Sequence, residues 1–233
     1  MRKLVLWGHH VDDYREMFDL TESDLNMRLL EYGCGASAVN AELKANTSGG
    51  TSFVTSCDPL FILDKSTLST QVSLIFEDMV SHVKHDEDKF DFTHHGSFDA
   101  LVALRRKGIV EFFNDYEKGK AEQRYLPVID HSLPFDDFEF DFALSSHYLF
   151  ADLDDQDVDF HLNAIRELAR VAKDVRIFPL IDRHGQASPF LGPVLLGLQQ
   201  GDYGVEVRNV SYYLQPKGNA MLRVWAKQCP LVL

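Results

Sequence analysis

The chain has 233 residues, of which 45% are hydrophobic and 25% are charged, as expected for a soluble globular protein with a core of its own. Its length fits one α/β domain with an added segment. The 23 basic and 36 acidic residues give a net charge of −13, which disfavours binding to nucleic acid and to anionic membranes.

Apolar residues recur at helical spacing in some segments of the first third of the chain and form short runs in others. In chain order, the pattern predicts a helix at 11–20, a second helix starting at Thr21–Asp24, a strand at 27–32, a helix at 37–45 and a strand at 52–57. We therefore expect N-terminal helices over about 11–26, followed by a strand–helix–strand unit.

An insertion is predicted at about 64–123, before the third strand. Helices are predicted at 68–83 and 98–125, and the polar, His-rich segment 82–98 between them is interpreted as a loop or lid. We expect the insertion to form a helical cap on the substrate side of the domain.

The rest of the chain again alternates strands and helices. The predicted elements are strands at 125–129 and 140–145, a helix at 157–172, a strand at 175–180, a helix at 189–200, and strands at 205–210 and 220–226. The last two read as an antiparallel hairpin. The alternation implies one α/β domain over residues 1–233, with a mainly parallel sheet.

The motif that says most about function is Glu31-Tyr32-Gly33-Cys34-Gly35, which stands where a predicted strand ends and a helix begins. Glycines at this place let the backbone turn tightly and approach a ligand. Asp58 ends the next strand, where an acid can accept both ribose hydroxyls of a nucleoside. Gly33-x-Gly35-x-x-Ala38 also satisfies a dinucleotide fingerprint, but Glu31 suits a ligand that carries an ammonium group.

A second constellation comes after the third strand. Asp130-His131-Ser132-Leu133-Pro134-Phe135 is followed by Phe140-Asp141-Phe142 and by Ser145-Ser146-His147. With the glycine turn and Asp58, this ordered set resembles the class I S-adenosylmethionine (SAM)-dependent methyltransferases over about 29–226, apart from the insertion. The segment 115–125 also resembles an uncharacterised bacterial subgroup of that family.

The resemblance implies a Rossmann-like methyltransferase fold: a seven-stranded, mainly parallel sheet with a reversed last strand, helices on both faces and a helical insertion between strands 2 and 3. It also implies SAM as the cofactor, with S-adenosylhomocysteine (SAH) as product. The implied cofactor-binding residues are Glu31, Tyr32, Gly33, Cys34, Gly35, Asn40, Asp58, Pro59, Leu60, Asp130, His131, Ser145 and Ser146.

The resemblance implies a role for most of these residues. Glu31 would engage the amino group of SAM, and the turn Gly33–Gly35 would lie along its methionine part. Asp58 would bind the ribose hydroxyls. Pro59, Leu60, Asp130 and His131 would surround the adenine, and Ser145, Ser146 and His147 would line the floor beneath the methyl group.

Methyl transfer needs a base only if the acceptor must lose a proton. His147 is the first candidate, since its ordinary pKa is near neutral. Tyr14 is the second, on a segment that would form the opposite wall of the site.

The histidines of the insertion do not predict a metal site. His82, His85, His94 and His95 have no cysteine partners and match no known ligand spacing, so no metal is expected. Three dispersed cysteines, Cys34, Cys57 and Cys229, favour a reducing cytoplasm over a disulfide framework.

We therefore expect a cytoplasmic, SAM-dependent methyltransferase acting on an unidentified small molecule, with neither nucleic acid nor membrane as partner. The oligomeric state is not indicated. One alternative is a non-catalytic protein that binds SAM or SAH. Another is an NAD-dependent oxidoreductase, whose sheet would lack the reversed last strand.

Overall fold

The computed structural model describes residues 8–46, 54–129, 131–151, 156–182 and 185–227. Its seven strands are β1 (Leu29–Tyr32), β2 (Val54–Asp58), β3 (Tyr125–Pro127), β4 (Phe140–Ser146), β5 (Ala172–Phe178), β6 (Tyr203–Asn209) and β7 (Ala220–Ala226). Its α-helices are α1 (Val11–Phe18), α2 (Val39–Asn46), α3 (Lys65–His85), α4 (Phe98–Ala121), α5 (Val158–Val171) and α6 (Leu191–Gln200).

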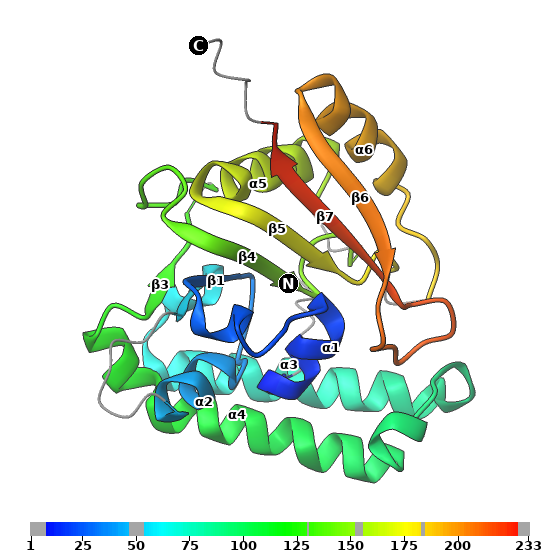
Figure 1. Cartoon of the computed structure of the whole chain (residues 1–233). Coiled ribbons are helices and arrows are strands. Elements are labelled where there is room, and N and C mark those ends of the chain that lie inside the picture. The colour runs from blue at the N-terminus through cyan, green and yellow to red at the C-terminus, as the bar shows by residue number, and fades with distance from the viewer. Residues whose placement is uncertain (1–7, 47–53, 130, 152–155, 183–184, 228–233) are drawn as a thin grey trace, which may run out of the picture.

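The strands form one sheet in the order β3-β2-β1-β4-β5-β7-β6 (Figure 1). The pairs from β3 to β5 are parallel, whereas β7 is antiparallel to both of its neighbours. This is the strand order of the class I methyltransferase fold with its reversed last strand, so the predicted fold class is confirmed. The closing hairpin of β6 and β7 is also as predicted.

Alternating side chains of each strand supply two separate cores. Leu30 of β1 and Ala143 of β4 pack with α5 and α6 on one face of the sheet. Leu29 and Leu144, each one position away, pack with α1 and α2 on the other face. This period of two is what a sheet covered by helices on both faces requires.

Two long helices stand between β2 and β3 in the chain. Figure 1 shows α3 and α4 side by side, and each has a side-chain N-cap, Asp64 for α3 and Ser97 for α4. The ring of Phe61 packs between Phe112 of α4 and Tyr125 of β3, which anchors α4 to the edge of the sheet. Whether the pair caps a substrate stays a prediction.

Two local predictions were wrong. Only a short 3-10 turn, Asp24–Asn26, stands where a second N-terminal helix was expected. The segment 82–98 is not one loop, since α3 continues to His85 and two 3-10 turns follow, Glu87–Lys89 and Thr93–His95. In the described residues, no helix is long and apolar enough to cross a membrane.

Candidate functional site

The glycine turn stands directly after β1 and is strongly bent. Gly33 and Gly35 adopt φ values of 66° and 55°, in the left-handed region that glycine reaches without a steric penalty. The amide of Gly33 donates to the carbonyl oxygen of Cys57 at 2.8 Å, which ties the turn to β2. The predicted turn is therefore a backbone elbow between the carboxyl ends of two neighbouring strands.

Asp58, the last residue of β2, points at this elbow. Its Oδ2 accepts a hydrogen bond from the amide of Gly35, and its Oδ1 accepts one from the amide of Leu60, both at 2.8 Å. Burial raises the pKa of Asp58 to about 6, although the two amides lower it. A second lone pair on each oxygen remains for a ligand hydroxyl.

Glu31 is buried beside the elbow, and Ser56 is its hydrogen-bond partner. The hydroxyl of Ser56 donates to its Oε2 at 2.5 Å, and burial raises the pKa of Glu31. The amide of Asn40 in turn donates to the Ser56 hydroxyl, and Arg124 donates to the Asn40 side-chain oxygen. Both ends of the Asn40 amide are used in this way, and a contact of Asn40 with the cofactor stays a prediction.

Several buried polar atoms at this edge of the sheet lack a hydrogen-bond partner among the described residues. They include Oε1 of Glu31, the hydroxyl of Tyr14 and the hydroxyl of Ser145. Nor does either buried carboxyl group, Glu31 or Asp58, form an ion pair with a basic side chain in the described part of the chain. Unpaired buried acids are costly, so the site suits a ligand that brings positive charge and hydrogen-bond donors.

Aromatic side chains fill the space over the elbow. The ring of Tyr148 packs so closely on Gly33 that a Cβ atom there would overlap it, and it meets the Tyr32 ring edge-on. The Tyr32 hydroxyl lies 3.0 Å from Nδ1 of His131, whose ring packs against Phe160. A ligand lying along Gly33 therefore requires Tyr148 to move.

The remaining predicted cofactor residues lie around this elbow or outside the described chain. Pro59 and Leu60 are half-buried in the 3-10 turn Pro59–Ile62. Cys34 is buried, and burial raises the pKa of its thiol, so that it stays protonated. Asp130 falls outside the described residues.

Gly33→Ala is expected to lower the melting temperature by about 3–10 °C. The change places a side chain at positive φ, which costs about 1–3 kcal/mol, and drives it into the Tyr148 ring. Gly192→Ala is the matched control, because a Cβ there meets open space. Differential scanning fluorimetry measures both, and equal melting temperatures for the two variants would contradict this view of the elbow.

His147 follows β4, where the floor of the site was predicted. Its Nδ1 lies 2.8 Å from the Ser146 hydroxyl and 3.2 Å from Nε2 of His9, and the two imidazole rings are stacked. Burial, and then the nearby His9 and Arg105, hold the pKa of His147 well below its ordinary value. His147 is therefore neutral near pH 7, although the same surroundings make its imidazole a weaker base than an exposed one.

Tyr14 lies on α1 with its hydroxyl near Glu31. Burial, followed by the charge of Glu31, raises the pKa of Tyr14 well above its ordinary value. The phenol therefore keeps its proton near neutral pH and can donate a hydrogen bond; the role of Tyr14 as a base stays a prediction.

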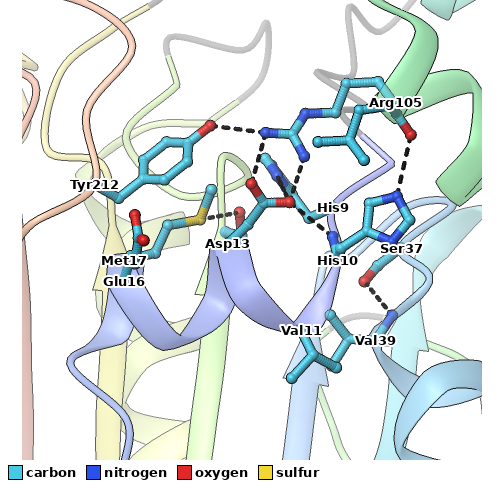
Figure 2. Close-up of polar contacts among 12 residues, drawn as sticks. His9, His10, Val11, Asp13, Glu16, Met17, Ser37, Val39, Arg105 and Tyr212 are labelled. Carbon is cyan, nitrogen blue, oxygen red and sulfur yellow. Dashed lines mark hydrogen bonds and ion pairs between the residues drawn. The ribbon is translucent and has the colours of Figure 1, made fainter. Parts of the chain in front are cut away.

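A buried polar network behind His147 was missed by the sequence analysis. Figure 2 shows the guanidinium of Arg105 between Asp13 and Tyr212. Both nitrogens of its fork contact the Asp13 carboxylate, and one also donates to the Tyr212 hydroxyl at 2.9 Å. Nδ1 of His9 lies 3.8 Å from the same carboxylate, which joins the network to His147.

The network buries two residues that their neighbours in the sequence would place at the surface. Arg105 begins the basic run Arg105-Arg106-Lys107, yet it is only 1% exposed. His95, assigned to a polar loop, is buried 3.3 Å from Arg105. A signal was present, because Arg105 lies on the same stripe of α4 as the apolar Leu101 and Phe112.

The chain matches no family model. An uncharacterised protein of Methanocaldococcus jannaschii is 26% identical over 223 residues, which span 95% of this chain and 96% of the relative. This relative is archaeal, whereas the sequence resemblance pointed to a bacterial subgroup.

The solved structures that the chain resembles include SAM-dependent methyltransferases. One from Aquifex aeolicus shares 18% identity, with 91% of this chain and 90% of the other covered and a TM-score of 0.41. A TehB-like one from Corynebacterium glutamicum shares 14% identity, with 87% and 80% covered and a TM-score of 0.41. At this level of similarity the relatives assign no activity to this chain.

Proposed function

We propose that this chain binds SAM at the elbow and uses it to methylate a small molecule. The observation that carries the proposal is the pair of buried carboxyl groups, Glu31 and Asp58, which flank the glycine elbow without a basic partner in the described residues. SAM brings a positively charged ammonium and sulfonium together with two ribose hydroxyls. Opposite charge and matching donors would satisfy both acids.

Each end of the cofactor has a candidate partner. The free Oε1 of Glu31 would accept from the ammonium group, with the Tyr14 hydroxyl beside it. The two oxygens of Asp58 would accept from the ribose hydroxyls. The residues present therefore fit the cofactor, once the Tyr148 ring moves off Gly33.

One of these carboxyl groups, Glu31, disfavours the oxidoreductase alternative. A dinucleotide would place its anionic pyrophosphate at the elbow, next to the buried Glu31, whereas an acid at the position of Asp58 suits the ribose of either ligand. The reversed β7 of the sheet also departs from what that alternative requires.

SAM supplies a methyl group that its sulfonium already activates, so the chain has to bind, orient and remove a proton. His147 is neutral near pH 7 and lies beyond β4, next to the elbow strand. A proton leaving the acceptor would be taken by the neutral imidazole of His147, whose ring Ser146 and His9 hold in place. The rest of the rate acceleration would come mostly from holding the acceptor atom in line with the methyl group of SAM.

The acceptor is proposed to be a small molecule, because the net charge of −13 repels nucleic acid. Incubation of the chain with methyl-labelled SAM and a metabolite panel tests this: label is expected in one chemical class of product. SAM binding without label transfer to any acceptor would favour the non-catalytic alternative instead.

His147→Gln is expected to lower kcat by about 100-fold or more, the range that loss of a general base produces. SAM affinity should stay within about twofold of the parent, since the ring contacts Ser146, His9 and Phe178. Single-turnover label transfer gives the rate, and His85→Gln, at an exposed position of α3, is the control. An unchanged kcat would show that His147 is not the base.

A further inference from the structure

A cluster of ionisable groups outside the elbow joins three helices. His10 is the N-cap residue of α1, Glu42 lies on α2 and Glu111 lies on α4. One oxygen of each carboxylate and Nδ1 of His10 all lie within 4.8 Å of one another. His10 is 32 residues from Glu42 and 101 from Glu111, so sequence spacing did not reveal the set.

The imidazole of His10 is held in one orientation. Its Nε2 donates to the carbonyl oxygen of Leu104 at 3.1 Å, which leaves Nδ1 turned toward the two carboxylates. Gly108 allows this close packing, because a Cβ there would overlap the Gly8 carbonyl and press on the ring. A histidine that donates one ring N–H to a backbone carbonyl, with the other nitrogen facing anions, has the arrangement of a metal ligand.

The two carboxylates also face this point. Oε1 of Glu42 lies 2.5 Å from Nδ1, and its Oε2 accepts from the amide of Val11, which fixes the carboxylate. Oε2 of Glu111 lies 3.6 Å from Nδ1 and is buried without a hydrogen-bond partner among the described residues. Nζ of Lys107 is 3.5 Å from Oε1, the other oxygen of Glu111.

We propose that His10, Glu42 and Glu111 bind a divalent first-row transition metal ion, of which Zn²⁺ is the probe of choice. One imidazole nitrogen and two carboxylate oxygens suit these ions better than Mg²⁺ or Ca²⁺. Metal–ligand distances of about 2.0–2.2 Å place two ligand atoms of one ion up to about 4.4 Å apart. Because the three atoms here already lie within 4.8 Å of one another, small side-chain shifts would complete the site. The ion would lock α1, which carries Asp13 and is preceded by His9, onto α2 and α4.

The test is titration of the full chain, after treatment with a chelator, with Zn²⁺ against a chromophoric competitor. One equivalent is expected to bind. Glu111→Gln should weaken the affinity by at least about tenfold, because removing a residue that only supports a metal ligand already costs about tenfold or more, and Glu111 is itself a ligand. Glu117→Gln, on an exposed position of the same helix, should bind like the parent.

Thermal unfolding gives a second readout that does not depend on SAM. Zn²⁺ should raise the melting temperature of the parent and of the Glu117→Gln variant but not that of Glu111→Gln, which should fold normally without metal. No saturable binding to the parent, or equal binding to both variants, would overturn the proposal, since the ion would then be absent or held elsewhere.

Discussion

Arg105→Ala is expected to lower the free energy of unfolding by about 3–5 kcal/mol, the cost of removing one partner of a buried ion pair. The guanidinium is 1% exposed and contacts both oxygens of Asp13. Without it the Asp13 carboxylate stays buried, and the Tyr212 hydroxyl loses a donor. Urea denaturation followed by circular dichroism at pH 7 measures the difference.

The neighbouring arginine provides a matched control. Arg106 forms an exposed ion pair with Glu77, so Arg106→Ala should cost about 1 kcal/mol or less. The loss of stability from Arg105→Lys should fall between those of the two alanine variants, since lysine keeps the charge but cannot form the bidentate contact with Asp13. A loss from Arg105→Ala no larger than that from Arg106→Ala would show that the buried network contributes little to stability.

Asp58→Asn is expected to weaken SAM binding by about 10- to 100-fold, the equivalent of a hydrogen bond to a charged group. The variant keeps the shape of the side chain but offers one acceptor oxygen where the ligand needs two. Asp78→Asn, at an exposed position on α3, should bind SAM like the parent. Calorimetric titration of each variant measures the affinity.

The pH dependence of binding gives a sharper form of the same prediction. Because burial raises the pKa of Asp58 to about 6, the carboxylate becomes protonated as the pH falls through that value. The ligand hydroxyls prefer the ionised form, so the affinity should fall below about pH 6 in the parent and change less in Asp58→Asn. Equal pH profiles for the two proteins would mean that Asp58 does not contact the ligand.

The elbow could be predicted from sequence because its parts are local. Gly33 and Gly35 directly follow a strand, and Asp58 ends the next one. Parallel neighbours bring such strand ends to the same edge of a sheet. The order of the motifs was therefore enough to place these residues together, as the hydrogen bond from Gly35 to Asp58 shows.

The buried network and the hydrogen bonds of Asn40 depend on contacts between distant segments. Asp13 and Arg105 are 92 residues apart, and Asn40 is 84 residues from Arg124. A polar residue in a sequence gives no direct sign of whether a partner will meet it inside the fold. Arg105 stands in a run of three basic residues, and only its helical spacing from Leu101 and Phe112 indicates the buried stripe of α4.

The central claim is that the elbow with Glu31 and Asp58 binds an adenosyl sulfonium, and calorimetry of the purified full chain tests it most directly. Separate titrations with SAM, SAH and NAD should show one site per chain for the first two and no binding of NAD. Absence of heat with SAH at millimolar concentration, or saturable binding of NAD instead, would contradict the account.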